Sequence, residues 1–502
     1  MTTILNSDCL AQIFHYLDFA ERVKLEGVCR LWCRIMAAYS TNSDIQEMNI
    51  AEFLKTTNTE YYQQDSLSFE PTTIGIIDRC GQYLQELSFG GEVDEGDAED
   101  FGFNGKVSWG IRQCHALRRL DLSAVIIHGD ISDVLDKVAE NLEDFSLEDT
   151  SWVDPEAPKK ITPYFPRMTR LRRLNMRAQS TAVLNELHNV GGELDTALRD
   201  MRNSSLIKLL ERQIGLKELV MCPSPVLLND EFMARLLNLR ALHTLRISHV
   251  PNEGYAIELL GQLEGLRKLA LQEVRSLTEE SLQLILTGLR KLESLSMAKC
   301  QNVYGFSALD HCHCLEELEI SDNTNLVDDD LFSVFGLGGL KRLRVVRCSN
   351  VSTEVIVHAL QRNQLETLDL TGSTMMNDEA LFAIASTQNE LGYLSVNGCY
   401  KTSSKGVAAI SHMANIEKLD VLDVSNNRKI NEMAILGLHN ALTLKRQNRR
   451  FERQAHQEDD GFKAADLAAL EIPSKLLKVY ATQSSISTSV DEAVADCIEI
   501  LR

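Results

Sequence analysis

A six-residue pattern of apolar positions recurs along most of the chain: apolar, two variable, apolar, one variable, apolar, as in LETLDL at Leu365. Eight copies follow one another with spacings of 26, 24, 26, 23, 25, 25 and 26 residues, and they start at Leu216, Leu242, Leu266, Leu292, Leu315, Leu340, Leu365 and Leu391. Looser copies start at Leu84, Leu117, Leu142 and Leu171, a weak one lies at Ile45, and a last one starts at Leu419. This regular period predicts a repeat architecture.

Each copy predicts a short strand followed by a helix. The last two apolar residues of the pattern are separated by one position, so they point to the same face of a strand. In the copy at Leu365, Asn377 is placed to cap a helix whose Leu381 and Ile384 face inward. One strand and one helix cannot bury their apolar faces alone, so stacked neighbours must complete the core. We expect an α/β solenoid, a horseshoe with parallel strands on the concave face and helices outside. The pattern resembles the leucine-rich repeat over roughly residues 45–430.

A small residue follows eight positions after the start of several copies. It is cysteine at Cys300, Cys348 and Cys399, and asparagine or serine at Asn323, Ser373 and Asn427. Such residues suit the turn that leaves a strand, because they can form hydrogen bonds to the backbone. We expect the three cysteines to be buried free thiols, and the copies resemble the cysteine-containing variety of leucine-rich repeat.

Three stretches interrupt the period, near residues 90–116, 151–170 and 177–215. They are interpreted as an acidic loop, a proline-rich segment that cannot form one continuous helix, and an extra helix. We assign residues 41–436 to the repeats and residues 437–502 to a helical C-terminal cap or tail. Its basic residues indicate a solvated helix face or, as the sharper alternative, a nuclear targeting signal; they are Lys445, Arg446, Arg449, Arg450 and Arg453.

The N-terminal 40 residues follow a different pattern, one of short amphipathic helices. Leu10, Ile13, Phe14 and Leu17 form one helical stripe, and a second follows with Val28, Leu31, Trp32 and Ile35. Helices this short cannot build an adequate core by themselves. Their apolar face must be completed by the solenoid or by a partner.

Residues 1–40 closely resemble the F-box, a helical module that docks on the Skp adaptor of cullin-based ubiquitin ligases. The matching residues are Leu5, Asp8, Leu10, Ile13, Phe14, Tyr16, Leu17, Asp18, Val23, Leu25, Val28, Cys29, Arg30 and Trp32. Asn6 stands where the family usually has proline, and Gly27 where a larger apolar residue is common. The resemblance implies adaptor binding through Leu5, Leu10, Ile13, Phe14, Leu17, Val28 and Trp32.

Charge and composition narrow the classes of partner. The net charge is −21, which disfavours nonspecific binding to nucleic acid or to an anionic membrane surface. No apolar run approaches the roughly 18 residues of a membrane span, and the N-terminus has no leader pattern. We expect an intracellular protein, in the cytoplasm, the nucleus or both, with neither nucleic acid nor membrane as partner.

Few residue patterns in the sequence indicate catalysis or metal binding. The segment 311–314, His-Cys-His-Cys, offers four potential metal ligands, but adjacent residues cannot all converge on one ion without distorting the backbone. We find no phosphate-binding glycine loop, no zinc-protease motif and no nucleophile elbow. We therefore expect no enzyme activity, no cofactor and no metal.

Polar residues within the later strands form the candidate substrate surface. The variable positions around the second and third apolar residues point away from the core. They assign Glu317 and Glu319 to one strand, Arg342 and Arg344 to the next, then Asp369, then Tyr393. In-register stacking predicts Glu317 beside Arg342, and Arg344 between Glu319 and Asp369. The simpler interpretation is a surface ladder of ion pairs, and the functional one adds Tyr393 as an aromatic anchor for a partner.

Together these features predict a substrate-recognition subunit of a Skp–cullin–F-box ubiquitin ligase. As the resemblance implies, the F-box would bind the Skp adaptor and through it a cullin, while the repeats would hold a protein substrate. Two alternatives stay open: a Skp-bound scaffold without ubiquitin transfer, and a plain repeat-containing binder with a vestigial F-box. The sequence does not name the substrate.

Overall fold

The computed structural model describes residues 6–26, 28–38, 42–57, 69–89, 102–148, 150–153, 160–177, 208, 210–211, 214–221, 230–248, 257–303, 306–332, 338–457 and 476–502. The chain divides into two compact units, Met1–Ser248 and His249–Arg502, which are described separately. No helix in these ranges combines the length and the apolar character that crossing a membrane requires.

The first unit begins with three short helices and continues as stacked strands. The helices are α1 (Ser7–His15), α2 (Phe19–Glu26) and α3 (Arg30–Ala38). The strands pair in parallel in the order β1 (Glu47–Asn49), β2 (Glu86–Ser88), β4 (Arg119–Asp121), β6 (Asp144–Ser146), β8 (Arg173–Met176), β9 (Glu218–Met221) and β10 (Thr244–Ser248). A smaller parallel sheet contains β3 (Gly102–Phe103), β5 (Ile126–Ile127) and β7 (Ser151–Trp152).

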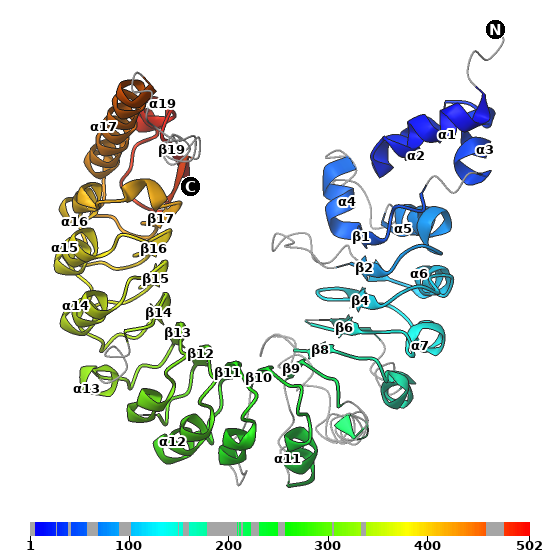
Figure 1. The fold of residues 1–502 in the computed structure, drawn as a ribbon, viewed down its shortest axis with the longest axis horizontal. Coiled ribbons are helices and arrows are strands. Elements are labelled where there is room, and N and C mark those ends of the chain that lie inside the picture. Colours follow the sequence, from blue (N-terminus) through cyan, green and yellow to red (C-terminus); the bar gives the residue numbers. More distant parts are fainter. Residues whose placement is uncertain are drawn as a thin grey trace. The chain divides into compact units, whose positions relative to one another are not determined.

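Helices lie between successive strands of the first unit, and α5, α6, α7 and α11 line one side of its sheet (Figure 1). They are α4 (Ile50–Thr57), α5 (Phe69–Cys80), α6 (Gly105–Ile111), α7 (Ser132–Val138), η3 (Thr162–Arg167) and α11 (Asp230–Leu237). The proline-rich interruption therefore contains a short 3₁₀ helix with Pro163 and Pro166 inside it, rather than a continuous α-helix. The acidic run and nearly all of residues 177–215 lie outside the described residues.

The second unit is more regular. Its strands are also parallel and follow the order β11 (Lys268–Gln272), β12 (Ser294–Ala298), β13 (Glu317–Ser321), β14 (Arg342–Val346), β15 (Thr367–Asp369), β16 (Tyr393–Ser395), β17 (Val421–Asp423), β18 (Leu477–Tyr480) and β19 (Ile498–Leu501). The α-helices of this unit are α12 (Glu279–Gly288), α13 (Asp328–Leu331), α14 (Thr353–Arg362), α15 (Asp378–Thr387), α16 (Ser404–Ala409), α17 (Glu432–Gln457) and α19 (Asp491–Val494). Short 3₁₀ helices complete it: η4 (Ile257–Gln262), η5 (Ser307–His311), η7 (Ile410–His412), η8 (Ile416–Lys418) and η9 (Thr488–Val490).

The repeat pattern explains this core. Leu365, Leu368 and Leu370, the three apolar residues of one copy, are fully buried. Asn377 accepts a hydrogen bond from the Glu379 backbone N–H at 2.9 Å and caps α15, whose Leu381 is buried against the strands. Strand, turn and helix repeat in this way along each unit. The predicted leucine-rich-repeat solenoid, preceded by short α-helices, is confirmed as the fold.

The C-terminal segment differs from its prediction. Residues 477–480 and 498–501 are strands that extend the sheet beyond β17, not helices. Leu477, Val479 and Ala481 alternate with exposed residues, which is the two-residue period of a half-buried strand. The long helix α17 separates these strands from the regular repeats, so the 25-residue period does not reach them.

Candidate partner-binding surfaces

The N-terminal helices build a small core of their own. Leu10, Phe14, Ile35 and Met36 are buried together, and Ala11, Leu17, Leu25 and Trp32 pack against them. The rings of Phe14 and Trp32 lie 5.2 Å apart, centre to centre. Asn6 caps α1 by accepting a hydrogen bond from the Cys9 N–H at 2.8 Å. Asparagine in place of the usual proline therefore still starts the helix.

The predicted adaptor-binding residues divide into two groups. Leu10 and Phe14 are in the core of the module, and Leu17 and Trp32 are partly buried against it. Ile13 and Val28 are 45 % and 58 % exposed, and Leu31, which was not among the predicted adaptor-binding residues, is 38 % exposed. Leu5 lies outside the described residues. Exposed aliphatic side chains of this size are the part of the module that a partner can cover.

A buried arginine joins the F-box helices to the segment that enters the first repeat strand. Arg22 is 2 % exposed, and its two terminal nitrogens each lie 2.7 Å from an oxygen of Asp44. Its guanidinium also donates to the carbonyls of Phe14, Leu17 and His15. The hydrogen bond from Arg22 is the main cause that lowers the pKa of Asp44.

Two further contacts fix the module on the repeats. Arg79 of α5 forms a bidentate pair with Glu26 of α2, with N–O distances of 2.7 to 3.0 Å. Hydrogen bonding to Glu26 also raises the pKa of Arg79. The rings of Phe19 and Phe53 lie 5.5 Å apart. Polar and aromatic contacts together attach α2 to the first repeats.

The outward-facing side chains of the strands of each sheet form what we call its strand face. In the second unit, Glu317 pairs in register with Arg342, and Arg344 lies in register between Glu319 and Asp369, which confirms the predicted order. Arg342 reaches Glu317 at 3.5 Å. The ladder is nevertheless incomplete, because no carboxylate of the described residues lies within ion-pairing distance of Arg344, whose buried Nε has no hydrogen-bond partner among them.

The two carboxylates on the strands beside Arg344 accept hydrogen bonds from neutral donors instead. Glu319 accepts a hydrogen bond from Ser296, and Asp369 accepts two from Thr371. Tyr393 lies two strands beyond Arg344, half-buried. Burial raises the pKa of Tyr393, and the charges of Asp369 and Asp423 raise it further. These residues form a polar surface around one arginine that keeps its charge available.

The strand face of the first unit carries the ladder that was predicted only for the second. Arg119 lies 3.2 Å from Glu86 and 3.4 Å from Asp144, and Arg173 lies 3.7 Å from Asp144 and 3.5 Å from Glu218. These residues occupy the third position of consecutive copies, where the signs of their charges alternate. That alternation could have revealed the ladder from the sequence. Each arginine here is paired on both sides, unlike Arg344.

The repeated cysteines share one structural role. The thiols of Cys300, Cys348 and Cys399 donate to a carbonyl of the preceding repeat, at Leu271, Ile320 and Leu370. Ser373, Asn323 and Asn427 donate to the equivalent carbonyls, which explains why the three residue types alternate there. All three cysteines are buried and free, and burial raises the pKa of Cys399 to about 12. In the segment 311–314, Cys312 is buried while its three neighbours are exposed.

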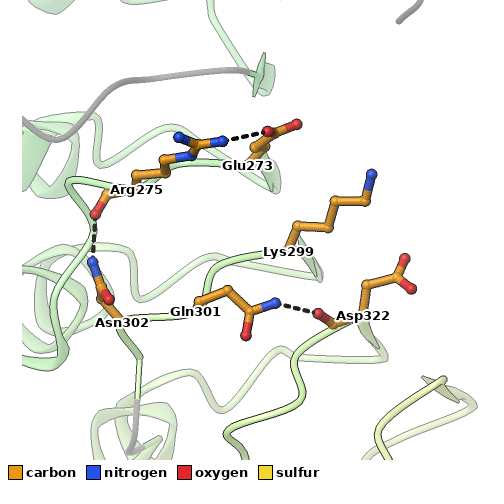
Figure 2. Close-up of a pocket in the computed structure, with 6 residues that line it drawn as sticks. All are labelled: Glu273, Arg275, Lys299, Gln301, Asn302 and Asp322. Carbon is orange, nitrogen blue, oxygen red and sulfur yellow. Dashed lines mark hydrogen bonds and ion pairs between the residues drawn. The ribbon is translucent and has the colours of Figure 1, made fainter. Parts of the chain in front are cut away.

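A cleft of about 500 Å³ lies beside the strand face of the second unit, at the carboxyl ends of its first strands (Figure 2). It is lined by Glu273, Arg275, Lys299, Gln301, Asn302 and Asp322. Glu273, Lys299 and Asp322 directly follow β11, β12 and β13, and all three have φ between 53° and 55°. Figure 2 shows Lys299 extending between the other two. The polar lining suits hydrogen bonding to a partner more than enclosure of an apolar ligand.

Comparison with known proteins identifies the N-terminal module. Residues 3–38 match the model of the F-box domain. The chain carries an F-box domain. No curated protein matches the chain. Among solved structures it is similar to the yeast Rad7 and Elc1 complex, with 13 % identity over 69 % of this chain and 92 % of that one and a TM-score of 0.42. It is also similar to a Leptospira interrogans LRR protein, with 14 % identity, coverage of 78 % and 92 %, and a TM-score of 0.31.

Proposed function

We propose that this chain is the substrate-recognition subunit of a Skp–cullin–F-box ubiquitin ligase. The F-box domain binds the Skp adaptor and through it a cullin, and the repeats bind a protein substrate. The observation that carries the proposal is the F-box domain held on the first repeats by Arg22–Asp44 and Arg79–Glu26. These contacts fix the position of the F-box domain on the first repeats, and positioning of this kind is what a proximity device requires.

The adaptor-binding surface is assigned to exposed apolar residues of the F-box domain. Ile13, Val28 and Leu31 would lose their contact with water when the adaptor covers them. Leu10, Phe14, Leu17 and Trp32 would shape this surface from beneath, because they pack together inside the module. Substitutions at those four positions would therefore test folding rather than docking.

The substrate surface is assigned to the strand face of the second unit, with Glu317, Glu319, Arg342, Arg344, Asp369 and Tyr393. Arg344 has no ion pair among the described residues, whereas Arg119 and Arg173 of the first unit are paired on both sides. A charge that is not already paired in the free protein costs less to redirect to a partner. Tyr393 adds a half-buried ring close by, and aromatic residues and arginines are the usual anchors of an interface.

Reconstitution with purified adaptor, cullin complex, ubiquitin-activating and ubiquitin-conjugating enzymes tests the proposal. Partners for this assay come from proximity labelling in cells in which ligase activity is blocked. We expect ubiquitin transfer to a bound partner only when the full chain is present. Adaptor binding without transfer to any captured partner would favour the scaffold alternative, and absence of adaptor binding would favour a plain repeat-containing binder.

The substrate surface has a separate test with a matched control. The double variant Arg344→Ala, Tyr393→Ala should lose at least tenfold in affinity for such a partner, which corresponds to about 1.4 kcal/mol. Arg290→Ala is the control, because Arg290 is exposed at the turn before β12, away from the strand face. Equal affinities for the double variant and the control would remove the substrate site from this surface.

A further inference from the structure

Three chemically different metal-ligand side chains converge at the C-terminal end of the second unit. His439 lies on α17, while Asp496 and Cys497 lie on the turn between α19 and β19. The candidate ligand atoms, His439 Nε2, an Asp496 carboxylate oxygen and Cys497 Sγ, all lie within 4.8 Å of one another. His439 and Asp496 are 57 residues apart in the sequence, so the cluster does not form a short sequence motif.

The ligand atoms lie close enough together for side-chain rotation to bring them to the separations of a tetrahedral zinc site. Zinc bonds of about 2.0 Å to nitrogen or oxygen and 2.3 Å to sulfur place N and O ligands about 3.3 Å apart, and sulfur about 3.5 Å from either. Here Asp496 lies 2.7 Å from His439 Nε2 through one oxygen and 3.5 Å from Cys497 Sγ through the other. Small side-chain rotations would centre an ion between them.

Thr443 offers an oxygen as a fourth ligand atom. The Thr443 hydroxyl lies one helical turn after His439, 3.5 Å from His439 Nε2 and 3.6 Å from Cys497 Sγ. These distances leave the hydroxyl close enough to supply a fourth ligand, and a water molecule can serve in its place. The Asp496 side chain is 64 % exposed while Cys497 is buried, so an ion can enter from the solvent side and reach the sulfur.

A hydrogen-bond donor lies beside the sulfur and the backbone of the proposed ligands. Arg446 Nη1 lies 3.2 Å from Cys497 Sγ and donates to the Asp496 carbonyl at 2.9 Å. Hydrogen bonds to the sulfur and to the backbone of a neighbouring ligand are the outer contacts that orient ligands in zinc sites. One thiolate and one carboxylate balance the charge of a divalent ion, while Arg446 stays outside the coordination sphere.

We propose that His439, Asp496 and Cys497 bind one zinc ion, with Thr443 or water as the fourth ligand. The ion would clip α17 to the start of β19, a strand that pairs with β18 near the end of the sheet. This is a structural role, and it is independent of ubiquitin transfer and of the F-box. It also opposes our sequence-based expectation that the chain needs no metal.

The test uses the full chain, purified in the presence of a chelator and then titrated with zinc and with cobalt. We expect one high-affinity site per chain, a thiolate-to-cobalt charge-transfer band in the near ultraviolet, and a rise in unfolding temperature on zinc addition. Cys497→Ser should abolish the band, and His439→Ala should weaken zinc binding at least tenfold. Cys314→Ser should change neither property, because Cys314 is an exposed thiol elsewhere in the same unit.

Two results would overturn the proposal. One is wild-type protein that binds no stoichiometric zinc or shows no charge-transfer band. The other is zinc affinity that His439→Ala and Cys497→Ser leave unchanged. Asp496→Asn keeps the test decisive if the Cys497 variant does not fold, because Asp496 is largely exposed and its loss should still weaken zinc binding at least tenfold.

Discussion

The Arg22–Asp44 pair makes a quantitative prediction about how the F-box domain is held. Arg22 is almost fully buried, with 3 % of its side chain exposed, while 35 % of the Asp44 side chain is exposed. Asp44→Ala would leave a buried guanidinium without its carboxylate. Arg22 would still donate to three carbonyls, and solvent would reach the vacated position. We therefore expect a loss of about 2 kcal/mol, the range of a hydrogen bond to a charged group, rather than the larger cost of breaking a fully enclosed pair.

Hydrogen exchange measures this loss where it occurs. Opening of α1–α3 exposes their amides, and about 2 kcal/mol corresponds to a roughly 30-fold fall in protection. Amides of the second unit should keep their protection. Asp133→Ala is the matched control, since its pair with Arg112 at 3.3 Å is exposed and worth at most about 1 kcal/mol, or roughly fivefold in exchange. If Asp44→Ala changed protection in α1–α3 no more than the control changes it in α6 and α7, the reasoning would be refuted.

Three further predictions follow from single contacts. Because Arg22 lowers the pKa of Asp44, this ion pair should stabilise the module fully at pH values above 3.8, the ordinary pKa of aspartate, and lose that contribution as the pH falls below it. Hydrogen exchange of the α1–α3 amides, measured across an acid titration, checks this. The same pH dependence in Asp44→Asn would contradict it. Cys348→Ser should change the unfolding temperature little, since Ser373 makes the equivalent hydrogen bond in the next repeat. Cys348→Val should lower the free energy of unfolding by about 1 kcal/mol, because it leaves the Ile320 carbonyl without its side-chain donor. Gly372→Ala should destabilise the fold by about 1 kcal/mol or more, because its φ is +68° and a new Cβ would meet Arg347 Cγ at 2.7 Å. An unchanged melting curve would contradict both the backbone strain and the steric clash.

The regular repeats could be predicted because the spacing of their apolar residues directly reflects the geometry of the strands and helices. The apolar positions of the copy at Leu365 determine which side chains enter the core, and the constant spacing determines the strand register. Glu317 therefore lies opposite Arg342 as expected. β18 was missed although Leu477, Val479 and Ala481 carry the alternation of a strand, because α17 separates it from the copies before it.

The candidate site was predicted less completely, since side-chain pairing depends on choices that the pattern does not encode. The sequence placed Arg344 between two carboxylates, but Ser296 and Thr371 compete successfully for them. In the F-box domain, Ile13 shares a helical stripe with Leu10 and Phe14, yet the neighbouring α3 covers only the latter two. Which flank of a stripe is buried depends on the partner helix, and that information lies outside the stripe itself.

The affinity of the purified chain for the Skp adaptor tests the central claim most directly. The double variant Ile13→Asp, Val28→Asp places two charges among exposed apolar residues, so the module should stay folded while docking is lost. Leu284→Asp is the control, because Leu284 is exposed on α12 of the second unit. We predict that calorimetry will show tight one-to-one binding for the wild-type chain and the control, and at least a hundredfold loss for the double variant. Absent binding by the wild-type chain, or equal affinity for all three proteins, would contradict the proposed F-box function.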